Sequence, residues 1–131
     1  MKCKLALLTI LFLLTINLFA HEGHEDSPLA MKANHGGTVK SGKELNLEYV
    51  VTGGEIKLFP VSHEGKDLPL NEVKLNVTAK LPRGKTAAVK IKNQDGAFVA
   101  QVDFKDAYRV EMNITANYNG KTDIFNVQVE K

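Results

Sequence analysis

Residues 110–129, VEMNITANYNGKTDIFNVQV, contain the pattern that decides the fold. Apolar side chains alternate with polar ones from Val110 to Tyr118, and the alternation resumes from Phe125 to Val129. A period of two is typical of a β-strand with one buried face. Between the two runs, Asn119-Gly120 favours a two-residue turn, because both residues tolerate positive φ. The stretch therefore predicts a long antiparallel hairpin.

Upstream, the same alternation recurs in residues 45–51, 73–81, 87–91 and 98–104. A further short strand starts at Ile56 and is expected to stop near Pro60, because proline cannot donate to a ladder. No segment has the apolar spacing of a helix. With turn signals about every 8–12 residues, the pattern predicts an all-β fold. We expect a single Ig-like β-sandwich of seven to eight mostly antiparallel strands. A barrel is the alternative, since alternation alone does not fix closure.

The first twenty residues have the three parts of a secretory signal peptide. Lys2 and Lys4 are basic, residues 5–18 are almost all apolar, and Ala20 precedes a polar break. The apolar run of about 14 residues is short of the roughly 20 that span a bilayer, which argues against an uncleaved anchor. We expect cleavage after Ala20 and export, to the periplasm, with no membrane span afterwards.

The predicted organisation is a signal peptide over 1–20, a His-containing flexible arm over 21–37 and the β-sandwich domain over 38–131. Lys2 and Lys4 account for the formal net charge of +2, so the exported chain would be neutral. No strong field then favours nucleic acid or anionic membrane.

Cys3, the single cysteine, leaves with the leader. The exported chain would therefore have no disulfide, no thiolate zinc site and no cysteine nucleophile. The sequence also contains no Gly-rich phosphate loop, no Gly-x-Ser-x-Gly and no His-Glu-x-x-His. We expect a protein that is not an enzyme and uses no organic cofactor.

Three of the four histidines lie in two short segments, HEGHED at 21–26 and HGG at 35–37. As a new N-terminus, His21 would offer both its free amine and a ring nitrogen to one metal ion, and His24 would add a second imidazole. Imidazole with carboxylate oxygen suits Cu(II), Zn(II), Ni(II) and Co(II). The predicted metal ligands are His21, His24 and His35.

Each of these interpretations has an alternative. The histidines of the arm can belong to a solvated polar tail that binds nothing tightly, because clustered histidine is only a compositional cue. Gly36 and Gly37 are explained equally by an entry turn before the first strand, in which His35 is merely exposed. The fourth histidine, His63, follows the second strand in a polar loop and is expected to face solvent.

Four segments resemble a small domain near the N-terminus of some periplasmic adaptor subunits. The matching segments are His35-Gly36-Gly37, 44–50, 54–58 and 65–69, and 95–98 and 108–110 fit the same layout. These adaptors serve cobalt–zinc–cadmium and copper type cation-efflux pumps, and similar domains occur as short stand-alone exported proteins. The resemblance covers most of residues 35–115 and implies a periplasmic β-sandwich linked to heavy-metal handling. The helical hairpin, lipoyl-like and barrel parts of an adaptor have no counterpart in this sequence.

Together these features predict an exported protein that binds a divalent transition metal through its N-terminal His arm. It would buffer the metal or pass it to a component of a cation-efflux pump. The alternative is a non-enzymatic Ig-like interaction module that docks on an envelope or efflux component through an exposed strand edge, without metal.

Overall fold

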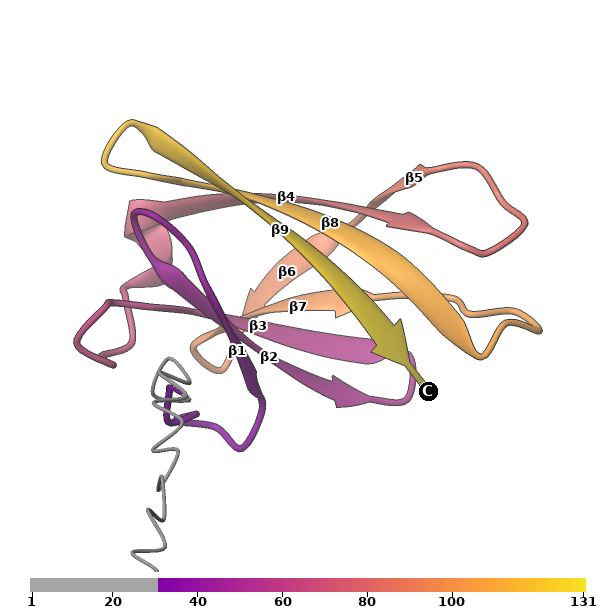
Figure 1. Ribbon diagram of the computed structural model, residues 1–131, viewed down its shortest axis with the longest axis horizontal. Coiled ribbons are helices and arrows are strands. Elements are labelled where there is room, and N and C mark those ends of the chain that lie inside the picture. Colours follow the sequence, from indigo (N-terminus) through magenta and orange to yellow (C-terminus); the bar gives the residue numbers. More distant parts are fainter. Residues whose placement is uncertain (1–30) are drawn as a thin grey trace, which may run out of the picture.

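The computed structural model describes residues 31–131, which form two packed β-sheets (Figure 1). The predicted signal peptide, and His21 and His24 of the predicted arm, lie outside the described residues. The described part of the chain contains nine strands and one three-residue 3-10 helix. They are β1 (Thr38–Ser41), β2 (Asn46–Thr52), β3 (Glu55–Val61), η1 (Leu70–Glu72), β4 (Val73–Lys80), β5 (Ala87–Val89), β6 (Ile91–Gln94), β7 (Ala97–Gln101), β8 (Arg109–Tyr118) and β9 (Lys121–Glu130).

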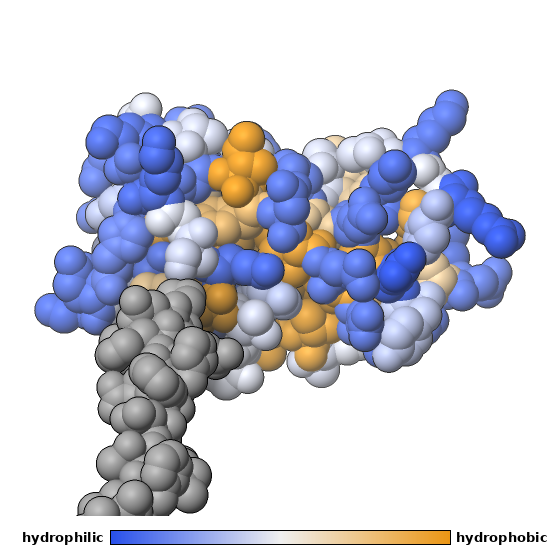
Figure 2. Space-filling view, viewed as in Figure 1, coloured by the Kyte–Doolittle hydropathy of each residue, from blue (hydrophilic) through white to orange (hydrophobic). Residues whose placement is uncertain are grey.

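One sheet has five strands in the order β1-β2-β3-β7-β6, and the other has four in the order β5-β4-β8-β9. All pairs between these strands are antiparallel. The arrangement confirms the predicted all-β sandwich. Figure 2 shows apolar side chains in the middle of this face of the molecule, with many of the polar side chains at its two ends. Within residues 31–131, no helix is long and apolar enough to cross a membrane.

The hairpin predicted from residues 110–129 is formed by β8 and β9. Asn119 and Gly120 have φ of 52° and 74°, as a tight primed turn requires. Ile114 and Phe125 lie opposite each other across the ladder, and both are almost fully buried. In this register, the apolar side chains of both strands face the other sheet. Burial of one large apolar side chain stabilises the folded state by about 1.5–3 kcal/mol.

The described residues form nine strands where seven to eight were predicted: β1 was not expected, and two predicted strands differ from the observed ones. The run over 87–91 is divided at Lys90, because β5 belongs to the four-stranded sheet and β6 to the other. The second predicted strand continues through Pro60 to the end of β3. Proline is tolerated there because β7 pairs only with Glu55–Leu58, while the Pro60 carbonyl accepts a hydrogen bond from the Leu68 N–H at 2.9 Å.

The outer face of the five-stranded sheet is also covered, contrary to the prediction that β2 has one solvated face. Asn46 and Glu48, expected on that face, are both 0 % exposed. A second apolar cluster on this side contains Phe59, Val61, Ala97 and Val99. The cover comes from the segment before β1, which is bonded to Glu48, and from the loop after β3, where the Ser62 carbonyl accepts a hydrogen bond from Asn46.

Candidate metal centre

The carboxylate of Glu48 anchors the chain where it enters the sandwich. Its Oε1 accepts hydrogen bonds from the backbone N–H groups of His35 at 2.7 Å and Gly37 at 3.0 Å. Its Oε2 accepts one from the N–H of Asn34 at 2.9 Å. These three donors offset the cost of burying a charged group. Residues 34–37, at the end of the predicted arm, are therefore held against β2.

Glycine is required at the two positions after His35 for different structural reasons. Gly36 has φ of +74°, a conformation that side chains with a Cβ rarely adopt. At Gly37 a Cβ would collide with the Tyr49 carbonyl oxygen and lie 2.8 Å from Val50 Cγ2. Both features match the entry turn that the sequence offered as one explanation of the glycines, and this turn fixes the position of His35.

The imidazole of His35 is held on three sides. It stacks on the ring of Phe59, with centroids 3.7 Å apart and planes 9° from parallel. Its Nδ1 lies 3.4 Å from Glu48 Oε2, and its Nε2 lies 3.0 Å from Asp67 Oδ2. The His35 side chain is 24 % exposed and that of Asp67 is 51 % exposed, so the contact between them is open to solvent.

Asp67 is in turn positioned by Asn34, the neighbour of His35. The Asn34 side-chain amide donates to Asp67 Oδ1 at 3.1 Å and to the Gly65 carbonyl at 2.8 Å. The loop itself is closed by hydrogen bonds between Ser62 and Lys66. Sequence reasoning missed Asp67, since no spacing relates this loop to His35. The segment 65–69 drew attention only through the family resemblance.

The two carboxylates that face His35 constrain its chemistry. A neutral imidazole has one N–H, so it can donate to only one of them. The other nitrogen then directs a lone pair at a carboxylate oxygen, unless a second proton or a metal ion lies between them. Metal-bound histidines commonly direct their second ring nitrogen to a carboxylate, as Nδ1 is directed to Glu48 here.

The distance between the outer donor atoms suits a shared ion. Two ligand atoms that are each about 2.1 Å from a metal lie about 3.0 Å apart at right angles, as in tetragonal Cu(II) or Ni(II) sites, and about 3.4 Å apart in a tetrahedral zinc site. His35 Nε2 and Asp67 Oδ2 are 3.0 Å apart, which fits the right-angled arrangement and is also the length of an ordinary N–H···O ion pair. Within residues 31–131, no group of three or more His, Cys, Asp or Glu side chains is placed to hold a metal. His35 and Asp67 are an ion pair that offers a metal ion no more than two of its ligands.

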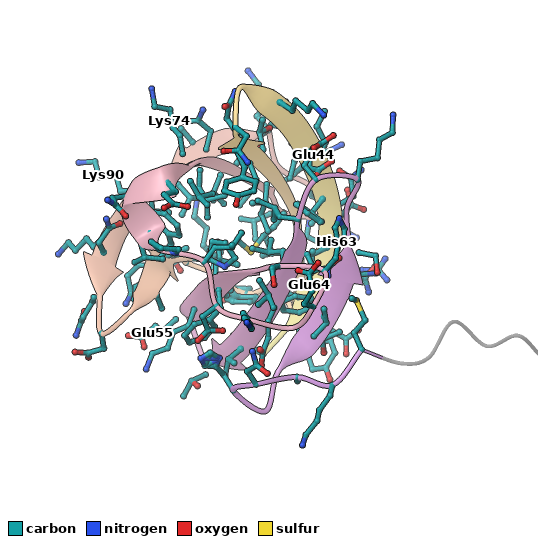
Figure 3. The ribbon with its side chains drawn as sticks, turned by 90° about the vertical axis from the view of Figure 1, so that its left-hand side faces the viewer. Glu44, Glu55, His63, Glu64, Lys74 and Lys90 are labelled. Carbon is teal, nitrogen blue, oxygen red and sulfur yellow. The ribbon has the colours of Figure 1, made fainter. Side chains whose placement is uncertain are left out.

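His63 is in the same loop as Asp67 and lies beside Glu64 (Figure 3), but its ring contacts neither member of the pair. Its Nε2 is 3.0 Å from the Lys43 carbonyl oxygen, so the ring is engaged with the loop between β1 and β2. Hydrogen bonds from its own backbone N–H and from Ser62 lower the pKa of Glu64 below 4.5.

A second buried carboxylate, that of Asp123 on β9, holds this same loop. It accepts hydrogen bonds from the backbone N–H groups of Lys43 at 3.0 Å, Glu44 at 2.8 Å and Leu45 at 3.1 Å. Burial by itself raises the pKa of Asp123, but the three donors and nearby His63 outweigh it, so the pKa lies below the ordinary 3.8. Asp123 thus fastens the β1–β2 loop across the edge of the sandwich.

Comparison with known proteins supports the fold and nothing finer. No family model matches the sequence, and no curated protein does. Among solved structures, a DUF4426 family protein from Pseudomonas aeruginosa is similar, with 19 % sequence identity and a TM-score of 0.59. The match covers 72 % of this chain and 96 % of that chain. The likeness shows a shared β-sandwich fold, and the relation to efflux adaptors stays a prediction.

Proposed function

We propose that this protein is an exported metal-handling protein that binds one divalent transition metal ion. The ligands are His35 and Asp67 of the sandwich, completed by His21 and His24 of the segment before it. The bound ion is buffered or passed to a component of a cation-efflux pump. The observation that carries the proposal is the separation of 3.0 Å between His35 Nε2 and Asp67 Oδ2, two partly exposed side chains from remote segments of the chain.

Three features hold the two proposed ligands in a fixed geometry. Stacking on Phe59 fixes the plane of the His35 ring, and Glu48 lies at its inner nitrogen. Asn34 donates a hydrogen bond to Oδ1 of Asp67, and the other oxygen, Oδ2, is directed at His35. A site held in this way loses little side-chain entropy when it binds an ion.

The missing ligands can come from the N-terminal segment. An extended chain gains at most about 3.3–3.6 Å per residue, so the stretch between His24 and His35 spans up to about 36 Å. This length allows the His24 imidazole to return to His35. A neutral imidazole and a terminal amine, added to one imidazole and one carboxylate, give the mixed nitrogen and oxygen set that Cu(II), Zn(II), Ni(II) and Co(II) accept.

The proposal is tested by isothermal titration of residues 21–131, prepared with a native His21 terminus, against each of the four ions. We expect one ion per chain. Asp67→Asn should weaken binding by about ten-fold or more, which corresponds to about 1.4 kcal/mol. The asparagine keeps the size of the side chain and an oxygen for Asn34. His21→Ala, and a single residue added before His21, should each weaken binding by a similar factor.

The matched control is His63→Ala, which removes a histidine that lies outside the pair and should leave the affinity unchanged. Binding that is insensitive to Asp67→Asn but lost in His21→Ala would restrict the site to the arm. If no variant changed the affinity, or if none of the four ions bound, the interaction-module alternative would replace this proposal.

A further inference from the structure

A groove lies on the side of the sandwich where β5 and β6 form the outer strands of the two sheets. It has a volume of about 740 Å³. Both sheets contribute to its lining, and so do the segments that follow β4 and β7. Its apolar residues include the partly exposed Leu81 and Val89, and the groove also reaches the buried Val102 and Val110. This size and lining fall within the range of small-molecule sites in proteins.

Four lysines contribute to the lining together with these apolar residues. Lys85, Lys90, Lys92 and Lys105 all contribute to the groove, whereas Asp103 is its one acidic residue. The Asp103 carboxylate already accepts a hydrogen bond from the Lys105 backbone N–H at 2.9 Å. None of the four lysines forms an ion pair with an acidic side chain of residues 31–131. Figure 3 shows Lys90 on the opposite side of the molecule from His63, and the groove shares no residue with the candidate metal centre.

We infer that this groove binds a monomeric long-chain fatty acid, with the alkyl chain against the apolar lining and the carboxylate among the lysines. The charge of the rim selects an anion, and the apolar lining selects a ligand with a hydrocarbon chain. A mostly cationic rim without acidic partners attracts a carboxylate more strongly than a neutral headgroup.

An added peptide strand fits this groove less well. A peptide that extends a sheet needs a row of unpaired backbone groups for its own hydrogen bonds. Here β5 has three residues and β6 has four, which is too little edge to satisfy an extended peptide. An alkyl chain has no backbone polar groups, so it can lie in the groove without leaving any unpaired.

Lysines on outer strands also discourage pairing between sheet edges of different molecules. That role needs only the charges, and it does not need an apolar groove between them. The two explanations therefore differ in whether a hydrocarbon chain binds and whether the lysines select its headgroup.

The test is calorimetric titration of residues 21–131 with dodecanoate below its micelle concentration. We expect one bound dodecanoate per chain, no measurable binding of acetate, and about ten-fold weaker binding of dodecanol. Lys90→Gln combined with Lys92→Gln should weaken dodecanoate binding by about ten-fold, as expected for the loss of two exposed ion pairs. Both lysines are exposed, so the variant should fold.

The matched control is Lys74→Gln, which removes an exposed lysine of β4 that does not line the groove. It should bind dodecanoate as the unaltered protein does. Equal binding of dodecanoate and dodecanol would overturn the role of the lysines. No binding of dodecanoate, including the case in which only vesicles of anionic phospholipid bind, would overturn the site.

Discussion

Two carboxylates on strands hold the loops of this protein in place. Glu48 on β2 and Asp123 on β9 are each almost fully buried, and each accepts three backbone N–H groups from a segment before or after β1. A buried carboxylate without partners would be strongly unfavourable, whereas three charge-assisted hydrogen bonds stabilise both the charge and the loop. These two residues fix the geometry of the sandwich where the chain enters it.

Glu48→Gln is expected to lower the free energy of unfolding by about 3 kcal/mol. The amide keeps one oxygen and replaces the other with an NH2 group. This group then faces backbone N–H donors, and it cannot accept a hydrogen bond from them. Urea denaturation of the two proteins measures the difference. Glu111→Gln, on the exposed face of β8, is the control and should change stability by less than about 0.5 kcal/mol. Similar small effects at both positions would contradict the anchoring role of Glu48.

The lowered pKa of Asp123 predicts a specific loss of stability in acid. Three backbone hydrogen bonds and His63 outweigh the effect of burial and lower its pKa in the folded protein, whereas the unfolded chain has an ordinary aspartate pKa near 3.9. The unfolded state therefore binds more protons, and the stabilisation from Asp123 is present above about pH 4 and is lost as the pH falls through the folded-state pKa. The free energy of unfolding, measured by urea between pH 6 and 2, should fall less steeply in Asp123→Asn than in the unaltered protein. Parallel curves would exclude this contribution.

Among the strands, the alternation in β4 and β8 separates core positions from surface positions. Ile114 is 1 % exposed, and Lys74 lies on the outer face of the paired strand. Ile114→Asp would bury an unpaired carboxylate at a cost of several kcal/mol, comparable to the roughly 5–15 kcal/mol that stabilises a domain, so this variant should not fold. Lys74→Asp should retain the β-sheet circular dichroism and the melting temperature. Equal behaviour of the two variants would mean that the strand faces are assigned wrongly.

The same alternation shows how far the sequence predicts the elements. It located β4, β8 and β9 because each buries one face and leaves the other in solvent. It failed at β2, where Glu48 was assigned to solvent although a loop covers it. The sequence of the neighbouring strands does indicate that this face is covered. Phe59 follows Leu58 in β3, and Val99 follows Phe98 in β7, so both faces of these strands are apolar.

The candidate site depends on the whole molecule, and the sequence predicted only part of it. His35 was recognised by its residue type and its glycines. Asp67 was not, because the pair is formed only when the loop after β3 folds over the segment before β1. His21 and His24 lie outside the described residues and stay predictions. A site assembled from two remote segments leaves no local periodicity for sequence reasoning to detect.

The central claim is that the ion is shared between the N-terminal segment and the sandwich, and thermal denaturation with Zn(II) tests it most directly. A ligand that binds only the folded state stabilises it, by about 2.7 kcal/mol at a hundred times the dissociation constant. For a domain of this size, that should raise the melting temperature of residues 21–131 by about 10 °C relative to chelator. Asp67→Asn should remove most of this increase, and His63→Ala should keep it. If calorimetry shows bound Zn(II) but the melting temperature stays at its value in chelator, the ion is held by the arm alone and the shared site does not exist.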